Sequence, residues 1–168
     1  EKLENICKVV ENFNSISGRM EIVSIKPLVI VDFAHTPDGM DEVLKSFPNK
    51  DIICVFGAGG NRDYLKRPLM GEVAKKYSKH IVVTSDNPRF EEPQEIIDDI
   101  KIGLAKTDGA FLEIIDRKEA IRYAIENGQV GDVIVLAGKG HEDYQEIKGV
   151  KYDMDERVLI AEILEEMK

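Results

Sequence analysis

The chain has 168 residues, of which 43% are hydrophobic and 33% are charged, and its formal net charge is -9. This length suffices for one domain with a buried core. An acidic chain lacks the basic face that nucleic acid or an anionic membrane would require, so neither is expected as a partner. No apolar run approaches the ~20 residues of a membrane span. No signal peptide is visible either, so the sequence predicts a cytoplasmic protein.

The N-terminal residues predict a helix followed by a domain boundary. Apolar residues recur at helical spacing over residues 1–13. The polar stretch N-S-I-S-G follows, and we place a domain boundary near Ser17. Residues 1–17 would then be the tail of a preceding domain and a linker, and residues 18–168 the domain proper. Because the chain begins with Glu1, we expect it to be part of a longer protein.

From residue 18 onward, predicted strands and helices alternate. Strands are expected at 20–25, 27–33, 51–56, 80–85, 111–115 and 132–137, with a hairpin over 144–152. Helices are expected after the N-cap Thr36, over about 67–77, from Pro93, from Asp116 to Asn127, and at the C-terminus. Several strands are continuous apolar runs, which is typical of strands covered on both faces. The sequence therefore predicts an α/β fold: a three-layer, Rossmann-like, mostly parallel sheet with helices on both faces.

Four loops carry most of the unusual residues. They are D-F-A-H-T-P-D (32–38), G-A-G-G-N-R-D (57–63), S-D-N-P-R-F-E-E-P (85–93) and A-G-K-G-H-E-D (137–143). Each follows a predicted strand directly. The carboxyl ends of parallel strands meet at one edge of a sheet, and ligands bind there. We therefore expect all four loops to gather on one rim.

Plainer interpretations exist for these loops. The glycine-rich loop could hold ordinary turn residues, and it lacks the third glycine of a dinucleotide fingerprint. Three histidines in separate elements do not predict a metal site. The G-K-G around Lys139 permits either close approach to a ligand or a plain turn, and Glu142 could be a solvated acid. Arg62, Arg67 and Arg89 could be surface charges, although three arginines on loops of an acidic chain favour binding of carboxylates or phosphates.

Taken together, the motifs resemble those of one family. D-F-A-H-T-P-D, F-G-A-G-G-N-R-D with K-R-P-L-M-G, S-D-N-P-R with E-E-P, and A-G-K-G-H-E-D-Y-Q occur in the order and spacing of a Mur ligase C-terminal domain, over about residues 18–168. The likeness is to members that add the third residue of the peptidoglycan peptide. It implies ATP-dependent ligation of an amino acid to UDP-N-acetylmuramoyl-L-alanyl-D-glutamate through an acyl phosphate. In this family the C-terminal domain holds the incoming amino acid and closes over ATP.

The resemblance also implies roles for single residues. The diamino-acid pocket would consist of Arg62, Asp86, Asn87, Pro88, Arg89, Gly138 and Glu142. S-D-N-P-R matches members that take meso-diaminopimelate, so Arg89, assisted by Asn87, and Arg62 would hold its carboxylates. Glu142 would meet an ammonium group. Contacts to the nucleotide would come from Arg19, Asp32 and His35.

Other parts of such an enzyme are absent from the sequence, which contains no G-x-x-x-x-G-K-[ST] phosphate loop. In the family that loop and the magnesium ligands lie in a central domain, and an N-terminal domain binds the UDP end. We therefore expect ATP and Mg²⁺ to serve only the parent enzyme, and no catalytic residue, metal site or ligase activity in this chain alone. Its partners would be those domains, the diamino diacid, ATP and the UDP-MurNAc-dipeptide, in a monomer.

Three alternatives remain open. The chain could belong to a related ligase of folate polyglutamylation, or it could be a stand-alone, non-catalytic module that binds diamino acids. A phosphate loop upstream in the parent reading frame would favour a ligase over such a module. Within the ligase hypothesis, a diamino diacid of similar length, such as lanthionine, would present the same four charged groups as meso-diaminopimelate.

Overall fold

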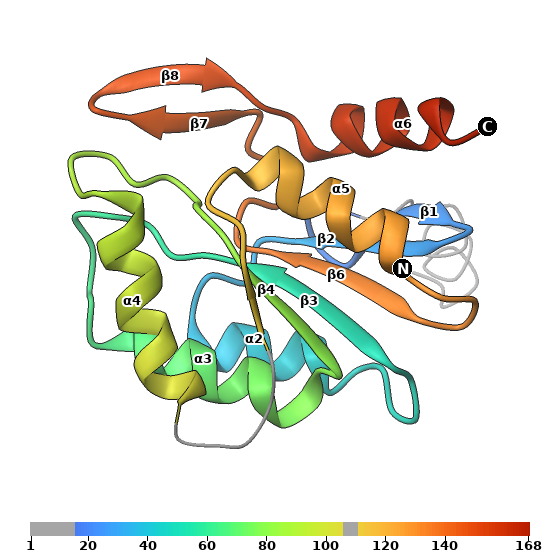
Figure 1. Cartoon of the computed structure of the whole chain (residues 1–168), viewed down its shortest axis with the longest axis horizontal. Helices are drawn as coiled ribbons and strands as arrows, with labels where there is room; N and C mark the ends of the chain where they lie inside the picture. The colour runs from blue at the N-terminus through green and yellow to red at the C-terminus, as the bar shows by residue number, and fades with distance from the viewer. Residues whose placement is uncertain (1–15, 106–110) are drawn as a thin grey trace, which may run out of the picture.

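A computed structural model describes residues 16–105 and 111–168 of the chain. The helix expected over residues 1–13 lies outside the described residues. A six-stranded sheet forms the centre of the molecule, in the order β1-β2-β6-β3-β4-β5 (Figure 1). The strands are β1 (Glu21–Ile25), β2 (Leu28–Asp32), β3 (Ile52–Phe56), β4 (His80–Val83), β5 (Leu112–Glu113) and β6 (Val133–Ala137).

The sheet is mostly parallel, as predicted. β2, β6, β3, β4 and β5 pair in parallel, and β1 pairs antiparallel with β2 at one edge. Every residue of β3 and β6 is buried. This burial explains the continuous apolar runs, because both faces of these strands are covered by helices.

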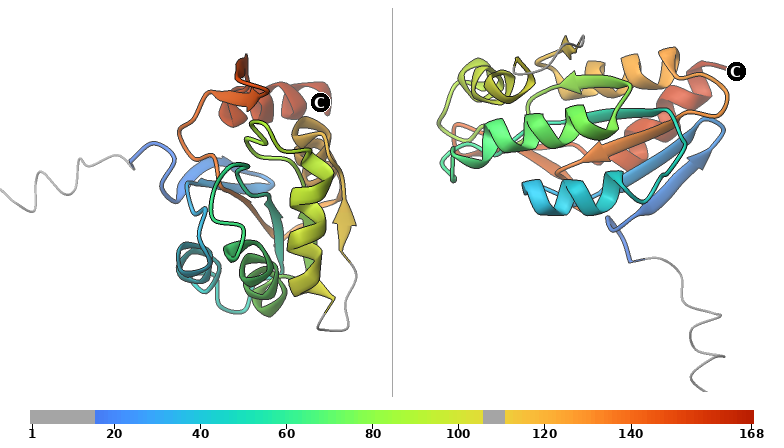
Figure 2. Two further views of the ribbon diagram at one scale, coloured as in Figure 1. Left: turned by 90° about the vertical axis from the view of Figure 1, so that its left-hand side faces the viewer. Right: turned by 90° about the horizontal axis from the view of Figure 1, so that it is seen from below.

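Helices form a layer on each face of the sheet (Figure 2). The first layer holds α2 (Pro37–Leu44), α3 (Lys66–Tyr77) and α4 (Pro93–Leu104), and the second holds α5 (Arg117–Asn127) and α6 (Glu156–Glu166). Side chains alternate along β3, so Cys54 and Phe56 pack in the first core whereas Ile53 and Val55 pack in the second. Cys54 is a buried free thiol, and burial raises its pKa to about 12.

Local sequence signals begin the helices where predicted. The Thr36 hydroxyl accepts a hydrogen bond from the Gly39 N–H at 3.2 Å, and Pro37 takes the first helical position. The Asp116 carboxylate likewise accepts hydrogen bonds from two N–H groups in the first turn of α5. These caps satisfy donors that a helix leaves unpaired at its start, which is why they could be found from sequence.

The edge strand β5 is shorter than predicted. A strand was expected over 111–115, but only Leu112–Glu113 form one. In the described sheet β5 is hydrogen-bonded to a neighbouring strand on one side only, so its outer edge lacks the hydrogen bonds that would keep the backbone extended. The ladder nevertheless continues beyond it, because the Ile114 N–H donates to the Val83 carbonyl at 3.1 Å.

The predicted hairpin forms a second, separate sheet of β7 (Tyr144–Ile147) and β8 (Val150–Asp153). Its two-residue turn, Lys148-Gly149, has φ values of 50° and 79°, which is the geometry that suits right-twisted hairpins. Together with α6 it lies above the central sheet in Figure 1. In the described part of the chain, no helix is long and apolar enough to cross a membrane.

Candidate functional site

The four unusual loops meet at the carboxyl edge of the sheet, as predicted. The Gly60 N–H donates to the Asn87 carbonyl at 2.9 Å, and the Gly138 N–H donates to the Asp32 carbonyl at 3.0 Å. A Cβ at Gly57 would lie 2.2 Å from the Thr84 carbonyl oxygen. The glycines at 57 and 60 are therefore required by the close approach of neighbouring loops, which goes beyond an ordinary turn.

Gly60→Ala tests this packing. A Cβ at position 60 would lie 2.0 Å from the Pro88 carbonyl oxygen, so the backbone around Pro88 would have to move. We expect a loss of about 1–3 kcal/mol in the free energy of unfolding, measured by urea denaturation. Gly59→Ala is the control, because the one atom with which its Cβ would clash is Arg89 Nη1, at 2.8 Å, the end of a flexible side chain. A loss at position 60 no larger than at position 59 would contradict the loop contact.

Arg89 is held in a special backbone conformation at the centre of the rim. Its φ is +52°, a value that costs free energy for a residue with a side chain. The hairpin stabilises it, since the Arg89 N–H donates to the Glu146 carbonyl and the Arg89 carbonyl accepts from the Lys148 N–H. The side chain is 19% exposed, with Nη1 donating to the Gly60 carbonyl at 2.9 Å and Nε 3.3 Å from Glu146 Oε2. Nη2 has no partner within the described residues.

Asn87 is buried, and the protein itself uses both ends of its side-chain amide. Oδ1 accepts from the Glu146 N–H at 2.8 Å and from Lys139 Nζ at 3.2 Å. Nδ2 donates to Glu142 Oε2 at 3.0 Å. In this structure Asn87 therefore positions Glu142, and its direct contact with a ligand stays a prediction.

Asp86, Pro88 and Gly138 shape the loops. Asp86 is buried, and its Oδ1 accepts a hydrogen bond from the Asn87 N–H at 2.6 Å. Pro88 is buried against the glycine-rich loop. Gly138 has a φ of +123°, and a Cβ there would lie 2.6 Å from Asp86 Oδ2. All three residues therefore hold the loops against one another, and their contact with an amino acid stays a prediction.

Glu142 faces the same rim and is not a solvated acid. Its side chain is 21% exposed, and Oε2 lies 3.4 Å from Lys139 Nζ in addition to its bond with Asn87. Oε1 has no partner in residues 16–105 and 111–168. Lys139 also belongs to this site, although the sequence did not predict it as a site residue. Its position between two glycines was the feature that could have indicated this role.

The two remaining arginines differ sharply. Arg62 is exposed and makes no hydrogen bond or ion pair in the described segments, so it is available to a ligand. Arg67 is only 3% exposed in its side chain and lies 2.8 Å from Glu91 and 2.9 Å from Asp99. Burial alone would raise the pKa of Glu91, but the Asn61 N–H and the Arg67 guanidinium lower it. Arg67 is thus neither a surface charge nor a ligand contact, because it binds carboxylates of its own chain.

The residues expected near the nucleotide form a separate group. The Asp32 carboxylate is buried and accepts from the N–H groups of Met20 and Ala34, both at 2.7 Å. Asp32 therefore anchors the loop backbone. Arg19 and His35 both contact the Phe33 ring, at 4.7 Å in each case, and His141 lies 5.5 Å from that ring.

The chain entering the domain packs against the 137–143 loop. The Gly18 carbonyl accepts a hydrogen bond from the Phe33 N–H at 2.9 Å. A Cβ at Gly18 would lie 2.1 Å from the backbone nitrogen of His141. The guanidinium of Arg157, on α6, donates to the Ser17 hydroxyl and, at 3.4 Å, to the His141 carbonyl. Gly18 to Met20 therefore pack as part of this domain, and Ser17 contacts it through Arg157.

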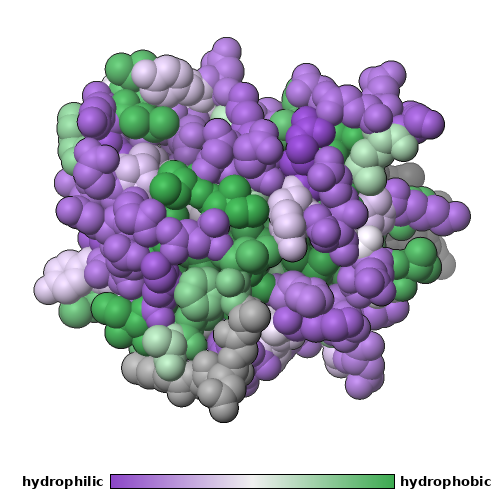
Figure 3. All heavy atoms as spheres, in the orientation of Figure 1, coloured by the Kyte–Doolittle hydropathy of each residue, from purple (hydrophilic) through white to green (hydrophobic). Residues whose placement is uncertain are grey.

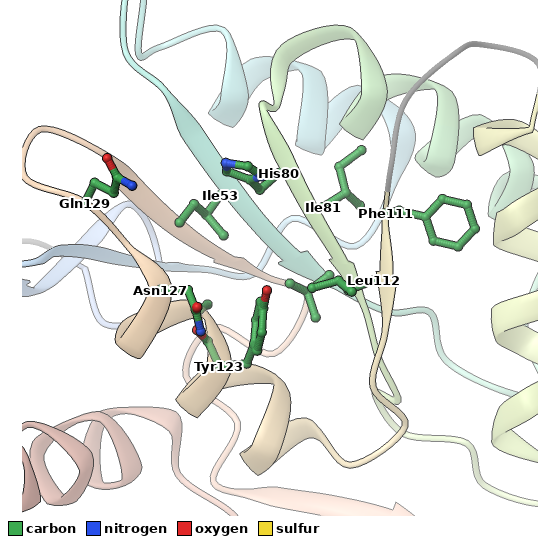
Figure 4. Close-up of a pocket in the computed structure, with 10 residues that line it drawn as sticks. Ile53, His80, Ile81, Phe111, Leu112, Tyr123, Asn127 and Gln129 are labelled. Atoms are coloured by element: carbon green, nitrogen blue, oxygen red, sulfur yellow. The ribbon is translucent and has the colours of Figure 1, made fainter.

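A hollow lined by both apolar and polar side chains lies elsewhere, beside β4 and β5 (Figure 4). Its lining includes Ile53, His80, Leu112 and Tyr123. Figure 3 shows hydrophobic residues near the centre of an otherwise mostly hydrophilic face. The hollow contains no residue of the four loops, so it is not the candidate site. Among the described residues, no group of three or more His, Cys, Asp or Glu side chains could hold a metal ion.

A three-layer α/β domain that presents arginine and glutamate side chains at its carboxyl edge is suited to binding a charged amino acid. Residues 18–140 match the family model described as Mur ligase, glutamate ligase domain. The chain therefore belongs to the Mur ligase family.

Curated and solved relatives agree with this membership. The UDP-N-acetylmuramoyl-L-alanyl-D-glutamate--2,6-diaminopimelate ligase of Aquifex aeolicus (strain VF5) is 51% identical over 154 residues, covering 89% of this chain and 32% of that protein. A solved structure of a ligase with the same name matches with a TM-score of 0.83 at 40% identity, covering 99% of this chain and 35% of that one. The chain thus spans about a third of the length of these relatives.

A more distant structure shares the fold alone. The bifunctional folylpolyglutamate synthase/dihydrofolate synthase of Yersinia pestis, solved with AMPPNP and a Mn ion, matches with a TM-score of 0.59 at 20% identity. The match covers 76% of this chain and 29% of that one. Of the two ligase alternatives raised by the sequence, the diaminopimelate ligases are the better supported.

Proposed function

We propose that this chain is the amino-acid-binding domain of a longer ATP-dependent ligase of peptidoglycan biosynthesis. That enzyme would add meso-diaminopimelate, or a diamino diacid of similar length, to UDP-N-acetylmuramoyl-L-alanyl-D-glutamate. The Aquifex aeolicus relative bears the name of that activity. We place the enzyme in the cytoplasm, as a monomer, with residues 1–17 as the tail of its central domain.

One observation carries the proposal: the polar atoms that the rim does not use itself. Among the described residues they include Nη2 of Arg89, the guanidinium of Arg62 and Oε1 of Glu142, on three of the four loops. Two cationic groups and one acid complement the two carboxylates and one ammonium group of a diamino diacid. The second ammonium group would remain for the reaction.

The chain's own residues would hold this amino acid while its amine attacks an activated carboxylate. ATP, when bound by the whole enzyme, supplies the phosphoryl group that activates the D-glutamate side-chain carboxylate. The amino group, once it has lost a proton to solvent, forms a C–N bond to the acyl carbon. The C–O bond to phosphate then breaks at the tetrahedral carbon, and the nitrogen releases its second proton. Arg19 and His35, gathered on Phe33, are suited to contact the nucleotide, because a guanidinium binds phosphate oxygens well. Mg²⁺ and the UDP end would be bound by the other domains.

A chimera tests the proposal. We expect an Aquifex aeolicus ligase whose C-terminal third is replaced by residues 18–168 to ligate meso-diaminopimelate in an ATP-dependent reaction, measured as amide product and released phosphate. The chain alone should show no ligation, because its sequence has no phosphate loop. A folded chimera that binds the diacid without ligating it would favour a non-catalytic binding module. Ligation by the chain alone would contradict the proposed division of labour.

A further inference from the structure

We propose that Lys139 is a positioning residue, which fixes the Glu142 carboxylate so that one of its oxygens is presented to an ammonium group of the ligand. This inference rests on the proposed function and deepens it, because it names the residue that prepares the acid of the site. Lys139 itself would not touch the ligand, since its side chain is 0% exposed.

The chain buries this lysine by an unusual backbone path. Gly138 has a φ of +123° and Gly140 a φ of +55°, so Lys139 lies between two residues with positive φ. A Cβ at Gly140 would lie 2.6 Å from Phe33 Cβ, which leaves no room for a side chain. Burying an ammonium group costs several kcal/mol unless it is paired. A buried lysine on a rim loop therefore needs an acceptor network to hold it.

The network consists of two side chains of the site. Lys139 Nζ lies 3.2 Å from Asn87 Oδ1 and 3.4 Å from Glu142 Oε2, and it also stands 5.6 Å from the centre of the Tyr144 ring. Asn87 Nδ2 in turn donates to the same Glu142 oxygen at 3.0 Å. Lys139 thus contacts Glu142 directly and also through Asn87.

The orientation of the Asn87 amide follows from these contacts. Its Oδ1 receives two donors, Lys139 Nζ and the Glu146 N–H. A flipped amide would place its NH₂ group against both donors and its oxygen against the Glu142 carboxylate. Lys139 and the Glu146 N–H therefore together favour the orientation in which Asn87 donates to Glu142.

The result is a carboxylate with one occupied and one unoccupied oxygen. Oε2 accepts from Asn87 and Lys139, whereas Oε1 has no partner in the described residues. An acceptor that is already immobilised loses less conformational entropy when the ligand binds. Removing Lys139 should therefore weaken binding of a ligand that donates to Glu142, by about tenfold on the scale of one immobilised side chain.

A double-mutant cycle in this chain tests the inference. Calorimetry would measure the dissociation constant of meso-diaminopimelate for the wild type, Lys139→Met, Glu142→Gln and the double variant. We expect Lys139→Met to weaken binding about tenfold in the wild type and less than about twofold in the Glu142→Gln background, because the lysine acts through that carboxylate. A purely structural lysine would cause the same loss in both backgrounds, and that result would overturn the inference.

Two controls keep the outcomes apart. Urea denaturation shows whether the Lys139→Met variant is folded. If it is unfolded, Lys139→Gln, which retains a hydrogen-bond donor without the charge, replaces it in the same double-mutant cycle. A wild-type chain that binds no meso-diaminopimelate at millimolar concentration would overturn the proposed function and this inference with it. Wild-type binding with an equal loss in both backgrounds, or tighter binding by Lys139→Met, would overturn the inference alone.

Discussion

Replacing Arg117 with methionine should lower the free energy of unfolding by about 3–5 kcal/mol. Arg117 and Glu156 have fully buried side chains, and Arg117 Nε lies 2.6 Å from Glu156 Oε1. The guanidinium also donates to the carbonyls of Ala137, at 3.0 Å, and Ser85, at 3.4 Å. Burial lowers the pKa of Arg117, but the nearby carboxylates of Glu156 and Asp86 outweigh burial and raise it. Methionine would leave Glu156 as a buried, uncompensated charge.

Urea denaturation checks this prediction, and the same helix offers a matched control. Arg122 lies 2.7 Å from Glu166 at the surface, with side chains 31% and 59% exposed. Arg122→Met should therefore cost less than about 1 kcal/mol. Adding Glu156→Leu to Arg117→Met should recover part of the loss, because it removes the unpaired charge. Equal losses for Arg117→Met and Arg122→Met would contradict this assignment.

Replacing Arg89 with alanine should abolish the preference for meso-diaminopimelate over L-lysine. L-Lysine lacks the second carboxylate, so in the wild type it would leave the Arg89 guanidinium desolvated without its ligand partner. That penalty is roughly 2–4 kcal/mol, or about 30- to 1000-fold in selectivity. The alanine variant has no such guanidinium, and the ratio of kcat/KM for the two amino acids in the chimera should fall by that factor.

Arg89→Lys provides the comparison for this experiment. It keeps the positive charge but loses the two-pronged geometry of the guanidinium, so we expect it to retain only part of the selectivity. Arginine, lysine and alanine all carry a Cβ, so the positive φ at this position should disfavour all three similarly, which limits the comparison to the rest of the side chain. If Arg89→Ala kept the full preference for the diacid, Arg89 would not be the residue that binds the second carboxylate.

Features that depend on neighbouring residues in the chain could be predicted well. Thr36 and Asp116 cap helices through N–H groups within three residues of themselves. The fully apolar strands β3 and β6 indicated the parallel sheet, because only strands covered on both faces can be apolar throughout. The gathering of four loops then followed from the parallel topology alone.

Features that depend on distant partners could not be predicted. The roles of Arg67 and Arg117 depend on acids 24 to 39 positions away in sequence, and no local pattern marks those pairs. The use of Asn87 to orient Glu142 has the same origin, since these residues lie 55 positions apart. Sequence therefore located the candidate loops, whereas only the structure separated side chains that keep unused polar atoms from side chains that hold the loops together.

The contacts of Gly18 with the 137–143 loop also have a mechanical consequence. Gly18 leaves no room between its backbone and that of His141, and Arg157 joins Ser17 to the same loop. Ser17 to Met20 are therefore joined to the rim by direct contacts. A change in the direction of the chain where it enters the domain would move the loop that carries Lys139 and Glu142, and a ligand that orders this loop would also restrict that direction.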